Sequence, residues 1–120
     1  MLKSLVLIVL TVLINTFGQF MVKTGVNRIG AVSLLDVHAL IRALTSWLVI
    51  CGFVIYFISA LIWISILSRA DLSWAFPILS LSYVITALLS PVLLNESFSA
   101  QRLIGTLVIC LGVFLVYKTY

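Results

Sequence analysis

Four apolar stretches of similar length dominate the pattern of hydrophobic and polar positions along the chain. They cover residues 5–22, 47–67, 72–94 and about 100–117, and most of the charged residues lie between them. A helix needs roughly 20 mostly apolar residues to cross the hydrocarbon core of a bilayer. The pattern therefore predicts an all-α integral membrane protein, with four transmembrane helices that form one membrane domain over residues 1–120.

The loop between the first two stretches carries a different pattern. Ser33, followed by Asp36 three residues later, is typical of a helix N-cap and its carboxylate partner. The apolar residues that follow fall within one arc of a helix: Leu34, Val37, Leu40, Ile41 and Leu44. This spacing predicts an amphipathic helix over about residues 33–45 that lies in the membrane interface. The alternative interpretation is an extended start of the second transmembrane helix.

The composition agrees with a membrane protein and excludes several function classes. Hydrophobic residues make up 64% of the chain and charged residues 8%, and the mean hydropathy is +1.36. Soluble domains have about 45–50% apolar and 25% charged residues. A soluble enzyme or a nucleic-acid-binding module is therefore excluded.

The few reactive side chains do not form a motif that predicts chemistry. The chain has one histidine and three acidic residues, and both Cys51 and Cys110 lie inside apolar stretches without metal-ligand spacing. We therefore expect no enzymatic activity, no metal and no cofactor. The net charge of +4 comes from singly scattered Lys and Arg residues, so no nucleic-acid partner is expected.

The distribution of basic residues between the two membrane sides is nearly even. Three stand on the side of the amino terminus and four on the other: Lys3, Arg69 and Lys118 against Lys23, Arg28, Arg42 and Arg102. Orientation normally follows the side with more Lys and Arg. A near balance favours insertion in both directions or an orientation fixed by a partner, and it suggests a homodimer or a heterodimer with a paralogue.

Polar residues recur every four positions in the first transmembrane stretch. They are Thr11, Asn15, Gln19 and Lys23, which we call the polar stripe. Residues four apart lie on the same side of a helix, so the polar stripe should face the interior of the protein. It either lines a wet cavity or forms hydrogen bonds that hold the helices together, each worth about 1 kcal/mol or less.

The third and fourth stretches have faces that match this polar stripe. Small, hydroxyl and aromatic residues follow helical spacing in the third stretch: Ser73, Phe76, Ser80, Tyr83, Ala87 and Ser90. Pro77 removes one backbone donor there, which leaves a carbonyl free to line a path. In the fourth stretch, Gly105 and Gly112 lie seven residues apart and predict close helix packing, within the chain or between two chains.

The membrane-spanning stretches contain no acidic residue. Glu96 follows the third stretch and Asp71 stands in the short turn before it. Proton-coupled export of cations generally depends on a carboxylate inside the membrane. The deepest charged group is instead Lys23, which with Gln19 and Asn15 suits an anion such as a phosphate at the headgroup level.

Several motifs resemble those of a known transporter family. Residues 75–82 read AFPILSLS and residues 94–99 read LNESFS, and a helix with Gly105 and Gly112 follows. This order resembles the EamA-like pattern of the drug/metabolite transporter superfamily, in which a Glu-containing turn precedes a Gly-bearing last helix. Gly18-Gln19 followed by Lys23, together with the FPILSL run, resembles the small subunits of the aminoarabinose-phosphoundecaprenol flippase.

The small multidrug resistance exporters share this architecture, but their site residues differ from those of this chain. The glutamate of their first helix aligns with Asn15, and the aromatic substrate contacts of their third helix align with Phe76 and Leu79. The last-helix motif that forms a dimer contact in that family is retained around Gly105 and Gly112. The resemblance therefore implies the same scaffold without the cation–proton site.

The leading hypothesis is a flippase that moves a polyprenyl-phosphate-linked sugar across the inner membrane of a bacterium. Lys23 would bind the phosphate, and Arg28 or Arg42 would draw it in from the interface. The groups that replace water around the sugar would be Thr11, Asn15, Gln19, Ser80 and Tyr83. Two alternatives stay open. One is an exporter of a small cationic or polar solute, in which Glu96, Asp71 or an acid of a partner subunit carries the coupling. The other is a membrane assembly subunit that does not transport.

Overall fold

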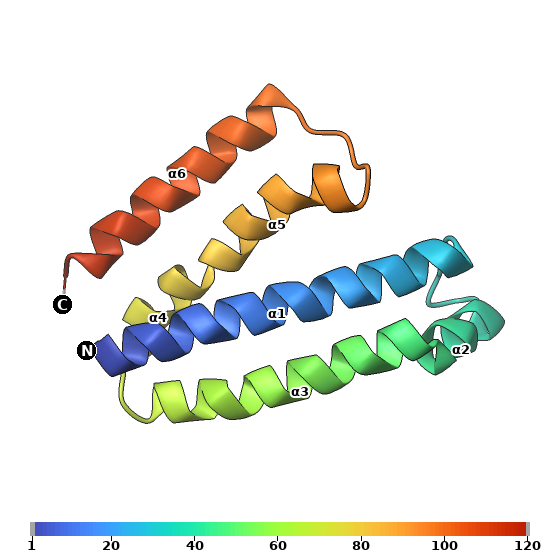
Figure 1. The fold of residues 1–120 in the computed structure, drawn as a ribbon, viewed down its shortest axis with the longest axis horizontal. Helices are drawn as coiled ribbons and strands as arrows, with labels where there is room; N and C mark the ends of the chain where they lie inside the picture. The colour runs from blue at the N-terminus through green and yellow to red at the C-terminus, as the bar shows by residue number, and fades with distance from the viewer. Residues whose placement is uncertain (1, 120) are drawn as a thin grey trace.

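The computed structural model describes residues 2–119, and within that range it contains α-helices and no strand. The helices are α1 (Leu2–Ile29), α2 (Val37–Thr45), α3 (Trp47–Leu67), α4 (Leu72–Leu79), α5 (Leu81–Leu93) and α6 (Ala100–Tyr117) (Figure 1). Four segments are long and apolar enough to span a membrane: Leu2–Ile29, Trp47–Leu67, Leu72–Leu93 and Ala100–Tyr117. The predicted all-α integral membrane fold with four transmembrane helices is confirmed.

The four spans lie in the order α3, α1, α4–α5, α6 (Figure 1). They alternate in direction, so the two chain ends lie at one end of the molecule, and the α5–α6 loop and α2 lie at the other. Within the described residues, α6 packs against α4 and α5 alone. The buried share of the most apolar 18 residues is 28% in α1 and 11% in α6, so α6 is the least buried of the four spans.

The α1–α3 contact is close because glycines occupy it. A Cβ atom at Gly18 would lie 3.1 Å from Cγ2 of Ile55, and one at Gly25 would lie 2.9 Å from Cγ2 of Val49. On the α3 side, a Cβ atom at Gly52 would lie 2.9 Å from the Gly18 carbonyl oxygen and would overlap the Val22 side chain. Small residues let helix backbones approach in a membrane, where packing rather than the hydrophobic effect drives association.

The third span is broken at Ser80, between α4 and α5. Pro77 has no backbone N–H and so cannot bond to the carbonyl four residues earlier. The Ser80 N–H donates to the carbonyls of both Phe76 and Pro77, at 3.2 and 3.1 Å, which tightens the last turn of α4. Pro91 lies within α5 without ending it. Pro77 therefore lies within the last turns of α4, and its carbonyl accepts one of the bonds that end this helix at Ser80.

The buried core lies toward the end of the molecule that holds the chain termini. It consists of Ile8, Val12, Ile66, Trp74, Ala75, Ile78 and Val113. These residues come from α1, α3, α4 and α6, so the core fixes all four spans at that end. Farther along, α5 contacts both α1 and α6, and polar side chains line the cavities there.

The first span and the loop after it differ from their predicted bounds. α1 does not end at Val22 but continues past Lys23 to Ile29. The next residue, Gly30, adopts a left-handed φ of +96°, which favours glycine. Ser33 is not the N-cap of the loop helix. Asp36 is the N-cap, because its side chain accepts a hydrogen bond of 3.1 Å from the Ala39 N–H, and α2 begins at Val37.

The glycine contact predicts opposite effects of one substitution at two positions. In a helix, Gly→Ala normally stabilises by roughly 0.5–1 kcal/mol. Gly52→Ala should instead lower the free energy of unfolding by about 1–3 kcal/mol, because the added methyl group overpacks the α1–α3 contact. The free energy can be measured by denaturant titration in detergent micelles.

Gly105→Ala is the matched control for this prediction. A Cβ atom at Gly105 meets no described atom within 4 Å, so this variant should be neutral or slightly more stable. Equal stability of the two variants would contradict the close α1–α3 packing.

Candidate functional site

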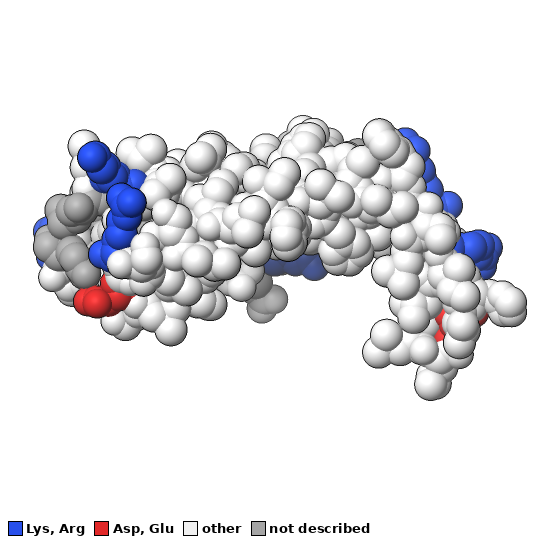
Figure 2. All heavy atoms as spheres, turned by 90° about the horizontal axis from the view of Figure 1, so that it is seen from below, with Lys and Arg blue, Asp and Glu red and all other residues white. Residues whose placement is uncertain are grey.

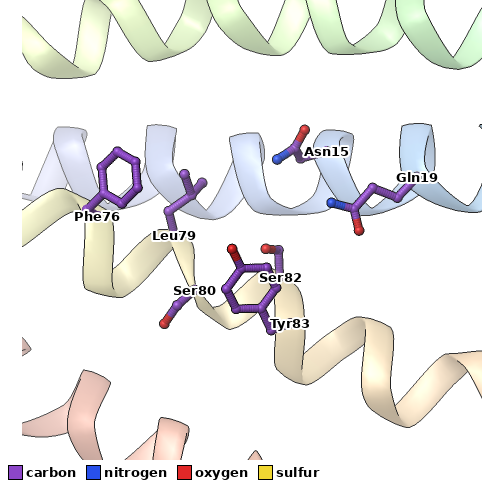
Figure 3. A pocket seen from close by; sticks show the side chains of 7 residues that line it. All are labelled: Asn15, Gln19, Phe76, Leu79, Ser80, Ser82 and Tyr83. Atoms are coloured by element: carbon purple, nitrogen blue, oxygen red, sulfur yellow. The ribbon is translucent and has the colours of Figure 1, made fainter. Parts of the chain in front are cut away.

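Three cavities adjoin one another between α3 and α6, and we call them the α3-side, central and α6-side cavities. The α3-side cavity has a volume of about 200 Å³ and is lined by Thr11, Asn15, Tyr56, Ser59, Ala60, Trp63 and Leu79. The central cavity, about 120 Å³, is lined by Asn15, Gln19, Phe76, Leu79, Ser80, Ser82 and Tyr83 (Figure 3). The α6-side cavity, about 270 Å³, is lined by Tyr83, Thr86, Ala87, Ser90, Pro91, Glu96, Ser97, Phe98 and Arg102.

Shared lining residues join these cavities into one row. Asn15 and Leu79 line both the α3-side and the central cavity, and Tyr83 lines both the central and the α6-side cavity. Figure 3 shows the Tyr83 hydroxyl directed toward α1, between the ends of the row. The central cavity is the smallest of the three. We call this row the polar path, and the smallest of its cavities lies beside Asn15 and Tyr83.

Asn15 has unused hydrogen-bonding capacity in this path. Its side chain is half-buried, and its amide makes no hydrogen bond to any residue from 2 to 119. An amide can donate two hydrogen bonds and accept two. Because an unpaired polar group within a membrane span is costly, this amide is placed to bond to water or to a polar substrate.

Gln19 joins three helices at the edge of the central cavity. The Thr86 hydroxyl of α5 lies 3.5 Å from the Gln19 Oε1 and donates a shorter bond of 2.7 Å to the Ser82 carbonyl. Tyr56 of α3 also forms a side-chain hydrogen bond with Gln19. Gln19 therefore stabilises the helix arrangement and also presents polar atoms to the cavity (Figure 3).

The hydroxyl groups of Thr11 and Ser80 are already used within their own helices. Thr11 is buried, and its Oγ1 donates to the Leu7 carbonyl at 2.8 Å. The Ser80 Oγ donates to the Pro77 carbonyl, and its side chain points toward α6, away from Asn15 (Figure 3). Both residues line the path as predicted, but their hydroxyl oxygens can offer a substrate acceptor sites rather than free protons.

Lys23 and Glu96 form an ion pair at the end of the path. The Lys23 Nζ lies 3.8 Å from the Glu96 Oε1, and the two side chains are 49% and 36% exposed. Glu96 reaches this position because Asn95, with a left-handed φ of 54°, turns the chain directly after α5. Asn tolerates this conformation better than most residues. The two residues that the sequence analysis assigned to competing hypotheses therefore contact each other.

Arg102 lies beside this pair on the first turn of α6. Its guanidinium Nη1 donates to the carbonyl of Ser97, in the loop that carries Glu96. Arg102 also lines the α6-side cavity together with Glu96. The end of the path therefore carries two basic groups and one acidic group, on three separate elements.

Figure 2 shows most of the charged side chains toward the two ends of the molecule and a smaller group of basic atoms near its middle. Glu96 is the one acidic residue that lines any of the three cavities, and it lies in a loop. The central and α3-side cavities contain amides, hydroxyls and aromatic rings. The geometry therefore gives a neutral polar path with its charges at one end.

The other predicted site residues lie outside this path. Arg28 lines a separate cavity with residues of α1, α3 and α5, and Arg42 is exposed on α2. A Cβ atom at Gly105 or Gly112 would meet nothing within 4 Å. The two glycines therefore make no close packing contact with another part of residues 2–119.

Sequence reasoning missed three groups that the fold brings to the path. Tyr56, Ser59 and Trp63 form a face of α3 at steps of three and four, and this spacing could have indicated it. Thr86 lies between two residues of the predicted third-span face. From the sequence, Arg102 served only as one of the basic residues that bear on the orientation of the chain in the membrane. Its place in the α6-side cavity depends on the α5–α6 loop.

The exposure of the Lys23–Glu96 pair predicts a small energetic coupling. Half-exposed ion pairs are worth about 0–1 kcal/mol because water screens both charges. Lys23→Gln, Glu96→Gln and the double variant should therefore show a coupling below about 1 kcal/mol in a double-mutant cycle of unfolding in micelles. A coupling above about 2 kcal/mol would mean that the pair stabilises the fold, and the variants could then not be used as functional probes.

Comparison with known proteins agrees with this arrangement. A model of the EamA-like transporter family matches residues 29–118. The probable 4-amino-4-deoxy-L-arabinose-phosphoundecaprenol flippase subunit ArnF of Serratia proteamaculans is 35% identical over 112 residues, 88% of this chain and 85% of its own length. The proteins of the same name from Proteus mirabilis and Photorhabdus laumondii are 32% and 30% identical, and cover 87% and 91% of this chain and 84% and 92% of their own lengths.

No solved structure matches the chain. The family match runs from the end of α1 through α6 and so includes the α4–α5 break, the Glu96 loop and the glycines of the last helix. The ArnF matches extend over most of the chain. On these findings, and with its four apolar spans, this multi-pass membrane protein belongs to the EamA-like transporter family.

Proposed function

We propose that this chain is an inner-membrane flippase subunit that moves a polyprenyl-phosphate-linked amino sugar between leaflets. The relatives are named as probable subunits of a flippase for such a lipid. The observation that carries the proposal is the polar path. Asn15 and Leu79 join its first two cavities, Tyr83 joins the second to the third, and Glu96 of the third contacts Lys23. The headgroup would follow this path while the polyprenyl chain stays in the lipid.

The chemistry in the middle of the path favours a sugar that binds through hydrogen bonds over a ligand that binds through positive charge alone. A cation held there would need a carboxylate, and the central cavity is lined by the amides of Asn15 and Gln19 and by hydroxyls. These groups can donate to and accept from sugar hydroxyls. A phosphate would bind at the end of the path, where Lys23 and Arg102 supply positive charge.

The depth of Lys23 supports a role at the headgroup level. It lies six residues before the end of α1 at Ile29, which corresponds to about 9 Å along a helix. Half of its side chain is exposed. Lys23 would therefore be open to a lipid phosphate at one surface of the bilayer, and the amides of the polar stripe continue inward from it.

The exposed face of α6 is the proposed contact with a second subunit. Gly105, Val108, Gly112 and Leu115 follow the spacing of one helical face, and all four are exposed. Two glycines on that face would let a partner helix approach closely. The partner is a second copy or a paralogue, and the word subunit in the relatives' names agrees with either.

The α6 contact predicts a loss of association without a loss of fold. Gly112→Leu should reduce the dimer fraction in nanodiscs at least fivefold, because the larger side chain separates the helices. Stability in micelles should change little, because the space around Gly112 is open within the chain. An unchanged dimer fraction, measured by mass photometry or cross-linking, would exclude this face as the contact.

Lys23 provides the test of the proposed function. Purified protein in lipid nanodiscs should bind undecaprenyl phosphate saturably, and Lys23→Gln should weaken this binding at least tenfold, or about 1.4 kcal/mol. A hydrophobic quaternary ammonium ion should not bind saturably. Both ligands can be titrated by tryptophan fluorescence or scintillation proximity.

Lys118→Gln is the matched control for this test. It removes the same charge at the opposite end of the molecule, where Lys118 lies over the Phe114 ring, and it should leave binding unchanged. Binding of the cation alone would overturn the proposal in favour of a cation exporter. Binding of neither ligand would favour an assembly subunit that does not transport.

A further inference from the structure

The α6-side cavity contains charges of both signs, which a purely anionic headgroup does not require. Glu96 and Arg102 both line it, together with polar groups of Tyr83, Thr86, Ser90 and Ser97. Lys23 contacts Glu96 from α1, at 3.8 Å. One carboxylate and two basic side chains therefore share one end of the path.

The carboxylate opposes the binding of a headgroup that carries negative charge alone. A phosphate at Lys23 would compete with Glu96 for the same ammonium group. Displaced from Lys23, Glu96 would stand unpaired beside a second anion, and the repulsion between the two like charges opposes binding. A cavity for anions alone would be better without this residue.

We propose that the Glu96 carboxylate binds the amino group of a zwitterionic headgroup, while Lys23 and Arg102 bind its phosphate. This inference rests on the proposed function and names the specificity residue of the same path. Lys23 and Glu96 neutralise each other in the structure. When the headgroup binds, its ammonium group replaces Lys23 at the carboxylate, and its phosphate replaces Glu96 at Lys23. Each charge keeps a partner of opposite sign throughout this exchange.

The local geometry favours such an exchange of partners. The Lys23–Glu96 distance of 3.8 Å is long for a charge-assisted hydrogen bond, and both side chains are partly exposed. The pair is therefore weak enough for a ligand to separate. Arg102 is held against the carbonyl of Ser97, next to Glu96 in the chain. Glu96, which would bind the amine, belongs to the α5–α6 loop, and Arg102, which would bind the phosphate, is hydrogen-bonded to that loop.

The experiment compares two lipids that differ at one atom position. Protein in nanodiscs is titrated with a polyprenyl-phosphate-linked 4-aminopentose and with its counterpart that carries a hydroxyl in place of the amine. The wild-type chain should bind the amino lipid at least tenfold more tightly at pH 7. Glu96→Gln should reduce this ratio to about one, chiefly by weakening binding of the amino lipid.

Asp36→Asn is the matched control, because it makes the same carboxylate-to-amide change away from the path and Asn also caps helices well. It should retain the wild-type ratio. Equal binding of the two lipids by the wild type, or an unchanged ratio in Glu96→Gln, would overturn this inference and leave the proposed function standing. Binding of neither lipid by the wild type would overturn the proposed function itself.

Discussion

The close contact of α1 with α3 is the constraint on which the rest of the arrangement depends. Gly18, Gly25 and Gly52 leave no room for side chains between the two backbones. Because adjacent helix residues are about 100° apart, the contact at Gly18 leaves Gln19 at the edge of the α1–α3 contact, where it reaches both Tyr56 of α3 and Thr86 of α5. The same rotation brings Asn15 to α4 and α5. The glycine contact therefore fixes the rotation of α1 that turns Asn15 and Gln19 of the polar stripe toward the central cavity.

Packing is unequal along the molecule, and the cavities follow from that inequality. The core of Ile8, Ile66, Trp74, Ile78 and their neighbours holds the spans together at the end with the chain termini. The break at Ser80 separates α4, which contributes to this core, from α5, whose side chains line the central and α6-side cavities. A headgroup path needs room that a close-packed bundle does not provide, and here the loosely packed half supplies it.

The charges of Lys23 and Glu96, which bear most directly on the type of ligand, form one site rather than two. As single residues in a sequence, Lys23 suits an anion and Glu96 suits a coupled cation, so each supports a different transporter. In the fold they lie 3.8 Å apart at the end of one path. A site with both signs distinguishes ligands by the arrangement of their charges rather than by net charge, and this provides a physical basis for specificity.

The sequence by itself determined the four spans, the helix in the first loop and the polar stripe, because hydropathy and residue spacing act locally. It placed the loop helix too early, since Ser33 and Asp36 are both good N-caps and only the backbone after Asp36 turns helical. The tertiary structure decided that Gly105 and Gly112 stay open, that Lys23 pairs with Glu96, and that Arg102 joins the path. Those outcomes depend on how helices distant in sequence rotate and pack against each other, which no local pattern encodes.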